Sequence, residues 1–393
     1  MAVKSGLDGL TGNRFELLHG RRVALLCNQA SIAADLRHAT ELFYAAHREG
    51  SIELIAFLGP QHGLWGHTQD NMIEWQGYRD PRTGIPVYSL YGEHRKPTEE
   101  MLSGIDTLVV DLQDVGAKYY TFIWTLSLCM EACAEKGIEV VVLDRPNPIC
   151  GEEMEGPAIN NNFRSFVGWH SLAIRHGMTI GEIAHYFQRE FYPACRLTVV
   201  SMYGWQRNMY FEETGLPWAM PSPNMPSPET ALVYPGMCLL EATNLSEGRG
   251  ATRPFEIFGA PWMDGWAFAA ELAQHHLPGV VFRPLEFQPT FQKHAGKVCG
   301  GCFIHITGRR QFKPFLTGIA IIREALRLYP EHFQWKQPPY EYEHEKMPFD
   351  ILVGNDWLRK MIDAQQSLRD MEELWEGETK VFSSVRLSAL LYP

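Results

Sequence analysis

Thr107-Leu-Val-Val-Asp-Leu112 is the stretch that decides the fold class of this chain of 393 residues. The short apolar run predicts a buried strand, and a helical stretch follows it from about Thr121 to Lys136. Further strands of the same kind are expected at Arg22–Cys27, Ile52–Phe57 and Val140–Asp144. Because apolar strands that alternate with helices form parallel sheets covered on both faces, we expect an α/β protein.

The second half of the chain has a different character. Between residues 217 and 261, prolines and glycines are frequent and long periodic segments are few. The elements expected after it are two strands and two helices, at Val280–Phe282, Phe303–Thr307, Gly318–Leu328 and Asp356–Ala364. The sequence therefore predicts a Rossmann-like domain with a parallel sheet over residues 1–160. A second, smaller α+β domain over residues 161–393 is expected to close a cleft against it.

Charge and cysteine content exclude several classes of partner. The 35 Lys and Arg residues are outnumbered by 46 Asp and Glu residues, which gives a formal net charge of −11. Nucleic acids and anionic membranes require basic patches, so we expect neither as a partner. The sequence contains no apolar run of the roughly 18 residues that a membrane span needs, and no signal-peptide pattern at its start.

The eight scattered cysteines favour free thiols in a cytoplasmic protein. We interpret the one close pair, Cys299 and Cys302, as structural rather than metal-binding.

Polar clusters follow the expected strands at their carboxyl ends. They are Asn28-Gln29, Gly59–Gly66, Asp111–Gly116 and Asp144–Pro148. Turn chemistry explains the glycines and prolines of these clusters, but it explains residues such as Gln113, Asp114, His62 and Arg145 poorly. In open parallel sheets, ligands bind beyond the carboxyl ends of the strands, so the sequence predicts a site at this edge.

Two loops carry side chains suited to an anionic ligand. Arg145 and Asn147 stand in a turn made rigid by flanking prolines, where an arginine can grip a carboxylate. An internal ion pair of Arg145, with Asp144 or a similar carboxylate, is the alternative. Arg175 and His176 come just before a predicted helix, where an anionic group is favoured.

Some polar residues have a structural explanation at the start of a helix. Thr179 and Glu182 have the spacing of a capping box. Thr121 either caps the helix that follows Tyr120 or contacts a substrate, and the sequence alone does not decide between these roles.

The densest polar cluster is Pro221–Pro226 followed by Glu241–Gly250. Cleavage of a glycosidic bond usually requires two carboxyl groups that flank the bond, and amides suit sugar hydroxyls. Glu241 and Glu247 are therefore candidates for a direct catalytic or sugar-binding role.

Several other enzyme classes lack their motifs. Gly59–Gly66 matches neither the GxGxxG nor the GxxxxGK[ST] pattern of nucleotide-binding loops. The chain contains no HExxH or GxSxG motif. We therefore expect no cofactor and no metal, and an oxidoreductase is the least favoured class.

Taken together, these loops resemble the pattern of the NamZ-type exo-β-N-acetylmuramidase family. Eight stretches match it in order, at Arg22–Gln29, Gly59–Gly66, Pro86–Tyr91 with Pro97-Thr98, Asp111–Thr121, Asp144–Pro148, Arg175–Thr179, Pro221–Pro226 and Glu241–Phe255. The resemblance implies a Rossmann-like domain, a smaller domain and a cleft between them. It also implies release of N-acetylmuramic acid (MurNAc) from the non-reducing end of MurNAc-GlcNAc fragments of peptidoglycan, without a cofactor.

The candidate site residues follow from these loops and from the resemblance. The catalytic candidates are Glu247, Glu241, Asp114, His62 and Gln61. The substrate-binding candidates are Asn28, Gln113, Tyr120, Arg145, Asn147, Arg175, His176, Asn224, Asn244 and Arg249. Because MurNAc carries a lactyl carboxylate, we expect one of Arg145, Arg175 and Arg249 to pair with it.

One position departs from the family pattern. Many relatives have a glutamate, thought to be catalytic, where this chain has Gln61, and an amide cannot transfer a proton as a carboxyl group does. Another carboxyl group, from Asp70, Glu74 or Glu93, replaces it, or Gln61 positions water or substrate, or the activity is altered. Many relatives are also exported, so the lack of a signal here favours recycling of imported wall fragments.

Two competing functions remain open at this point. The first is a non-catalytic protein that binds sugars or muropeptides, which Gln61 favours. The second is a glycosidase for another acidic sugar. The oligomeric state is also open.

Overall fold

A seven-stranded sheet forms the first lobe of the computed structural model, which describes residues 2–70 and 72–393. Its strands are β1 (Arg22–Cys27), β2 (Glu53–Gly59), β3 (Tyr78–Arg79), β4 (Pro86–Ser89), β5 (Thr107–Asp111), β6 (Glu139–Leu143) and β7 (Leu197–Val200). Their order is β3-β4-β2-β1-β5-β6-β7, with β3 antiparallel and the other pairs parallel. The predicted α/β class and all four predicted strands are confirmed.

The strand order of this sheet has a switch point between β1 and β5. The β1-α2-β2 unit proceeds to one side of β1, and the β5-α3-β6 unit proceeds to the other, where α2 is Ala39–Arg48 and α3 is Phe122–Lys136. Because such crossovers are right-handed, α2 and α3 cover opposite faces of the sheet. The crevice at such a switch point, outside the carboxyl ends of the strands, is where open α/β sheets bind ligands.

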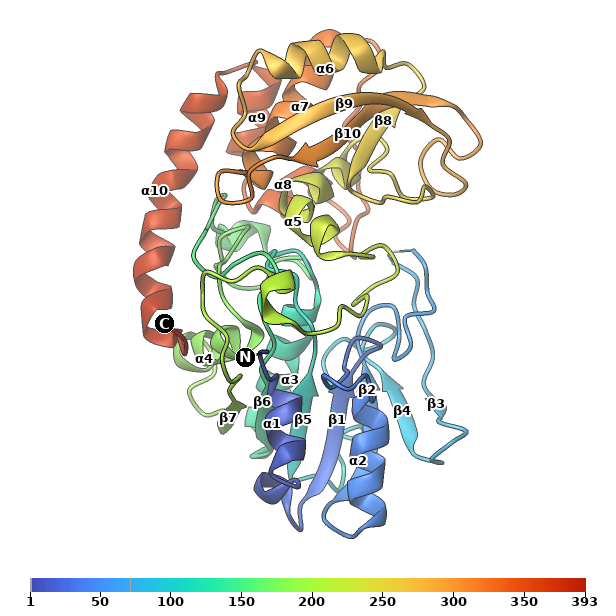
Figure 1. The fold of residues 1–393 in the computed structure, drawn as a ribbon, viewed down its shortest axis with the longest axis vertical. Coiled ribbons are helices and arrows are strands. Elements are labelled where there is room, and N and C mark those ends of the chain that lie inside the picture. Colours follow the sequence, from blue (N-terminus) through green and yellow to red (C-terminus); the bar gives the residue numbers. More distant parts are fainter. Residues whose placement is uncertain (1, 71) are drawn as a thin grey trace.

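The second lobe is smaller and combines an antiparallel sheet with helices (Figure 1). The sheet has the order β8-β10-β9, from β8 (Ile257–Ala260), β9 (Val280–Phe287) and β10 (Cys299–Ile306). Its helices are α5 (Pro228–Met237), α6 (Gly265–Ala273), α7 (Pro314–Leu328), α8 (Pro348–Val353) and α9 (Trp357–Asp363). The predicted α+β character of this lobe is thereby confirmed.

Helix α5 was not expected, because the sequence between residues 217 and 261 shows few periodic segments. Ser227 caps this helix and Pro228 occupies its first turn, which tolerates proline because no backbone donor is needed there. Gly236 of α5 lies directly against α7, since a β-carbon at Gly236 would come within 1.8 Å of the Pro314 carbonyl oxygen. This backbone contact fixes the segment after α5, which enters the candidate site.

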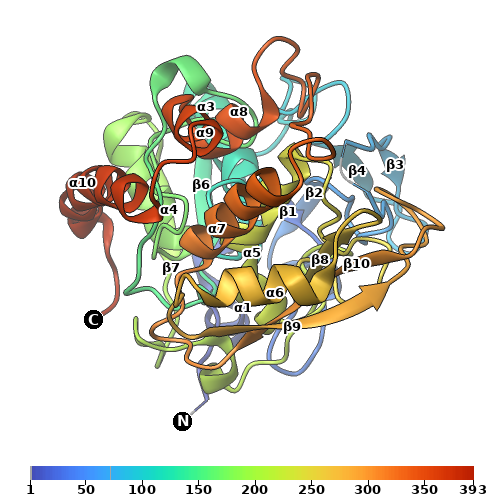
Figure 2. The same cartoon turned by 90° about the horizontal axis from the view of Figure 1, so that it is seen from above.

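The last long helix, α10 (Leu368–Arg386), runs along the side of both lobes and returns the chain to the first (Figures 1 and 2). After it, the Tyr392 hydroxyl donates a 2.6 Å hydrogen bond to Asp144, which follows β6. Strand β7 joins the first sheet although it lies after residue 160. The division of the chain at residue 160 itself stays a prediction.

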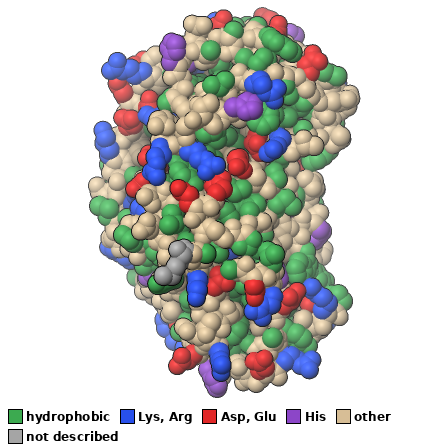
Figure 3. Space-filling model, in the orientation of Figure 1, with side chains coloured by type: hydrophobic (Ala, Val, Ile, Leu, Met, Phe, Trp, Pro, Cys, Tyr) green, Lys and Arg blue, Asp and Glu red, His purple; other side chains and the backbone are tan. Residues whose placement is uncertain are grey.

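Helix α4 (Ile180–Glu190) begins with the capping box predicted for Thr179 and Glu182. All eight cysteines are free and buried, including Cys299 and Cys302 on β10. No helix among the described residues is long and apolar enough to cross a lipid bilayer. On the face shown in Figure 3, acidic and basic side chains are interspersed.

Candidate active site

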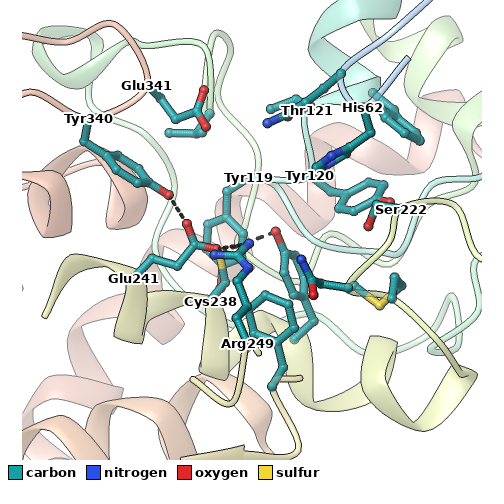
Figure 4. Close-up of a pocket in the computed structure, with 17 residues that line it drawn as sticks. His62, Tyr119, Tyr120, Thr121, Ser222, Cys238, Glu241, Arg249, Tyr340 and Glu341 are labelled. Carbon is teal, nitrogen blue, oxygen red and sulfur yellow. Dashed lines mark hydrogen bonds and ion pairs between the residues drawn. The ribbon is translucent and has the colours of Figure 1, made fainter. Parts of the chain in front are cut away.

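A pocket lies between the carboxyl edge of the large sheet and the second lobe. It encloses about 520 Å³ of empty space, a volume that includes open solvent at its mouth. The first lobe contributes Gln61 and His62, which follow β2, and Tyr119–Thr121, which lies between β5 and α3. The second lobe contributes Glu241 and Arg249 among others (Figure 4).

Glu241 and Arg249 belong to a buried cluster in which positive and negative charges balance. Glu241, on the 3-10 helix Cys238–Ala242, lies 2.8 Å from the Arg249 guanidinium and accepts a 2.5 Å hydrogen bond from the Tyr340 hydroxyl. Arg249 also lies 3.2 Å from Glu247, which is 2.9 Å from the Lys293 ammonium. Two cations therefore match two buried carboxylates, as buried charges require.

Glu247 belongs to this cluster but does not line the pocket. Burial alone would raise its pKa, but the adjacent Lys293 and Arg249 outweigh burial and lower it. Its carboxylate thus holds Arg249 in place.

A second carboxyl group of the pocket, Glu341, is not among the residues that the sequence indicated. It is 3% exposed and accepts a 2.9 Å hydrogen bond from the Tyr91 hydroxyl. Burial raises the pKa of Glu341 to about 7, although the bond from Tyr91 acts in the opposite direction. At neutral pH a large part of this group therefore carries a proton.

Gln61 is fixed by hydrogen bonds at both ends of its amide. The Thr121 hydroxyl donates to its oxygen at 2.6 Å, and its nitrogen donates to the Tyr91 hydroxyl at 3.2 Å. Thr121 makes no capping bond to the helix that it precedes, so the capping alternative for this residue is wrong.

His62 offers a neutral imidazole. Its Nδ1 lies 2.8 Å from the Thr68 carbonyl oxygen, a contact that requires the proton on Nδ1 and leaves Nε2 as an acceptor. Burial lowers the pKa of His62 to about 4, with a further contribution from Arg249. A neutral histidine of this tautomer can accept a hydrogen bond from a sugar hydroxyl or from water.

The predicted site residues divide into two groups. Those that line the pocket are Gln61, His62, Tyr120, Asn224, Glu241 and Arg249. Those that lie outside its lining are Asn28, Gln113, Asp114, Arg145, Asn147, Arg175, His176, Asn244 and Glu247.

Most residues of the second group have internal partners that hold the loops around the pocket. Arg145 pairs with Asp111, at 2.5 and 2.8 Å, so the alternative of an internal ion pair is confirmed, with Asp111 rather than Asp144 as the partner. Asp114 lies 3.2 Å from His176. Asn28 donates to the Pro221 carbonyl, which ties the end of β1 to the loop that carries Asn224.

The remaining amides and Arg175 follow the same pattern. Gln113 donates to the Pro146 carbonyl and Asn147 to the Met178 carbonyl. Asn244 donates to the His332 carbonyl within the second lobe. Arg175 donates to the Ile149 carbonyl and borders a different hollow, under α10.

The three carboxyl groups proposed to replace the family glutamate do not line the pocket. Asp70 accepts a hydrogen bond from Gln292. Glu74 is 45% exposed and contacts Tyr342, and Glu93 is 87% exposed. Glu341 is the carboxyl group that the structure brings beside Gln61, through Tyr91.

Other lining residues that were not among the predicted site residues are Tyr119, Ser222, Tyr234, Cys238 and Tyr340. The segment Tyr340–Glu343 alternates aromatic and acidic residues after two prolines. This pattern is the sequence feature that could have indicated Tyr340 and Glu341. Among the described residues, no group of three or more potential ligands gathers to hold a metal ion.

These features define a class of protein. A doubly wound sheet, closed at its carboxyl edge by a second lobe, holds a polar pocket with two carboxyl groups in contrasting surroundings. Such carboxyl pairs are the acid–base equipment of glycoside hydrolases.

The chain belongs to the NamZ exo-β-N-acetylmuramidase family. The N-terminal domain of that family matches residues 23–229 and its C-terminal domain matches residues 232–392. The chain is 42% identical, over 99% of its length and 91% of the relative's, to the peptidoglycan β-N-acetylmuramidase NamZ of Bacillus subtilis strain 168.

Two crystal structures of DUF1343 family proteins from Bacteroides fragilis have the same fold. One superposes with a TM-score of 0.88 at 33% identity, and the other with a TM-score of 0.76 at 27% identity. Both comparisons cover 100% of this chain and 99% of the other.

Proposed function

We propose that this protein is an exo-β-N-acetylmuramidase that hydrolyses the terminal MurNAc residue from the non-reducing end of MurNAc-GlcNAc fragments of peptidoglycan. The observation that carries the proposal is the convergence of loops from both lobes on one pocket with two carboxyl groups, Glu241 and Glu341. The activity named for the Bacillus subtilis relative supports it, since the similarity spans nearly the whole chain.

Within the pocket, the residues have complementary tasks. The carboxyl groups serve acid–base chemistry at the glycosidic bond. His62 accepts a hydrogen bond from a sugar hydroxyl through Nε2, and the Asn224 amide and the Tyr120 hydroxyl bind other polar groups of the sugar. No cofactor takes part in this scheme.

The lactyl carboxylate of MurNAc is assigned to Arg249. Of the three arginines predicted for this role, Arg249 lines the pocket, whereas Arg145 is occupied by Asp111 and Arg175 borders another hollow. The Nε of Arg249 has no hydrogen-bond partner among the described residues, so the guanidinium retains donor capacity.

The decisive experiment compares chromogenic glycosides of three sugars. The protein is incubated with the 4-nitrophenyl β-glycosides of MurNAc, GlcNAc and glucuronic acid, and with the MurNAc-GlcNAc disaccharide. We expect release of nitrophenol from the MurNAc glycoside, and of free MurNAc from the disaccharide, with little turnover of the other two.

Other results would favour the competing functions. Tight binding of the disaccharide with no turnover of any glycoside would indicate a sugar-binding protein, the function that the amide of Gln61 favours. Faster turnover of the glucuronide would indicate a glycosidase for another acidic sugar.

We also propose that the protein works in the cytoplasm on imported wall fragments. The free state of all eight cysteines supports this location, because thiols persist in a reducing compartment. Fractionation of cells that express the tagged protein at native level tests it, with recovery outside the cytoplasm as the contrary result.

A further inference from the structure

Glu341 occupies an unusual backbone position. Tyr340 and Glu343 exchange two backbone hydrogen bonds of 2.9 Å, so Glu341 and Tyr342 are the two central residues of a tight turn. Both have a positive φ, 45° and 67°, which turns of this type normally fill with glycine or asparagine. Strained residues of this kind persist where the surroundings hold them and often have a functional reason.

The turn brings Glu341 into the pocket. Figure 4 shows Glu341 and the Tyr340–Glu241 pair on one side of the pocket, with Thr121 and His62 across from them. Glu341 also lines a second hollow, whose wall includes Phe166, Trp169 and Arg95 among others. Glu341 therefore borders two hollows.

A directional chain of hydrogen bonds ends at Glu341. Thr121 donates to Gln61, Gln61 donates to Tyr91, and Tyr91 donates to Oε2 of Glu341. Every donor in this chain points toward the carboxyl group, so Oε2 is the accepting oxygen and a proton on Glu341 belongs on Oε1. Among the described residues, no hydrogen bond to Oε1 is formed.

The other carboxyl group has different surroundings. Glu241 lies against the guanidinium of Arg249 and accepts a bond from Tyr340, whereas Glu341 meets a neutral phenol at its Oε2. Pairs of carboxyl groups whose environments differ in this way divide the roles of acid and base.

We propose that Glu341 is the proton donor to the leaving oxygen during glycoside hydrolysis. The amide of Gln61 cannot fill this role, because an amide does not transfer a proton as a carboxyl group does. The inference rests on the proposed function. As the bond between the anomeric carbon and the glycosidic oxygen breaks, its electron pair goes to the oxygen, which takes the proton from Oε1 of Glu341. The leaving sugar departs as an alcohol. Water then supplies hydroxyl to the anomeric carbon, and the proton that it loses restores the acid form of Glu341.

The pKa of Glu341 agrees with this role. Burial raises it to about 7, so the acid form persists up to neutral pH. Brønsted behaviour favours a general acid whose pKa lies near the working pH.

Glu341→Gln tests the proposal with substrates that differ in leaving group. A natural GlcNAc leaving group needs a proton, whereas a dinitrophenolate leaves without one. We expect kcat/KM for MurNAc-GlcNAc to fall by about 10²–10⁴-fold, and kcat/KM for the dinitrophenyl MurNAc glycoside to fall by less than about 10-fold. The fall in activity of the parent protein above about pH 7 is expected to vanish in the variant.

Two further variants separate chemistry from folding. Glu345→Gln changes the same functional group at an exposed position of the same segment, and it is expected to match the parent protein. Glu341→Asp keeps a carboxyl group and is expected to retain the alkaline fall in activity at a reduced rate.

The failure of this inference is distinguishable from the failure of the proposed function. If the parent protein hydrolyses no MurNAc glycoside, the proposed function is wrong. If the parent protein is active but Glu341→Gln slows both substrates equally, or keeps the alkaline limb, the proton donor is a different group. If Glu341→Gln does not fold, an Asp variant that folds and lacks the alkaline limb overturns the proposal, and one that retains it supports the proposal.

Discussion

The Tyr91 hydroxyl donates a 2.9 Å hydrogen bond to the Glu341 carboxylate. This contact joins the loop after β4 of the large sheet to the turn Tyr340–Glu343. Burial and the adjacent Glu341 raise the pKa of Tyr91, so the phenol stays protonated and remains a donor. The contact stabilises the charged form of Glu341, while burial favours the neutral form. Removing the hydroxyl therefore tips the balance toward the protonated carboxyl group.

Tyr91→Phe is expected to move the alkaline fall of kcat/KM to higher pH. The hydrogen bond from Tyr91 lowers the pKa of Glu341, so its loss raises that pKa above about 7. A hydrogen bond to a charged group contributes about 1.5–3 kcal/mol, which corresponds to a shift of about 1–2 pH units. The pH profile of kcat/KM measures the shift, and Tyr342→Phe, whose hydroxyl contacts Glu74 instead, is the control. A shift to lower pH in Tyr91→Phe would contradict the assignment.

Arg249→Lys is expected to weaken selection for MurNAc. Lysine keeps a positive charge beside Glu241 and Glu247 but loses the planar fork that binds a carboxylate through two donors. We expect kcat/KM to fall by about 10-fold or more for the MurNAc glycoside and by much less for the GlcNAc glycoside, in line with one lost charge-assisted hydrogen bond. Arg253→Lys is the matched control, because Arg253 is exposed and pairs with Glu256. Equal losses on both sugars would remove Arg249 from lactyl recognition.

Much of the fold was predictable because its determinants are local. β1, for example, has five consecutive buried residues after Arg22, and this apolar run is visible in the sequence. Helix α5 was hidden because Pro228 and Pro235 resemble loop residues, although Pro228 occupies a first turn, where proline is tolerated. Its stability comes from its contact with α7, which a local pattern does not contain.

The site was predictable only where strand ends or a dense polar loop marked it. Gln61 and His62 follow β2, and Glu241 and Arg249 lie in the polar cluster, so the sequence indicated all four. Glu341 escaped because it is brought to the pocket by a turn distant in sequence, and nothing local to it predicts burial. For Arg145, the sequence suggested its neighbour Asp144, but the partner is Asp111 on the adjacent strand, a pairing that depends on strand order.

Arg145→Ala is expected to destabilise the protein without a direct effect on substrate selection. Asp111 is fully buried and makes a two-pronged ion pair with Arg145, so the substitution leaves a buried carboxylate without its cation. Breaking a buried pair in this way typically costs about 3–5 kcal/mol. Urea unfolding measures the change. Arg37→Ala, which removes a pair with Asp35 at the surface, should cost less than about 1 kcal/mol. Equal small effects from both substitutions would show that Asp111 finds another partner.

Lys118→Met is expected to stabilise the protein near neutral pH, and the gain is expected to shrink as the pH rises. Lys118 is fully buried, and its ammonium has no hydrogen-bond partner among the described residues. Burial lowers its pKa from 10.5 to about 7, so between these values the unfolded chain binds a proton that the folded chain does not. Stability of the parent protein therefore gains up to about 1.4 kcal/mol per pH unit from this group in that window, and the methionine variant lacks that gain. Urea unfolding at pH 7, 8 and 9 gives the difference between the two proteins, with Lys136→Met, an exposed site, as the control. A difference that stays constant over this range would mean that the Lys118 amine keeps its proton in the folded state and has a partner that the side-chain contacts do not reveal.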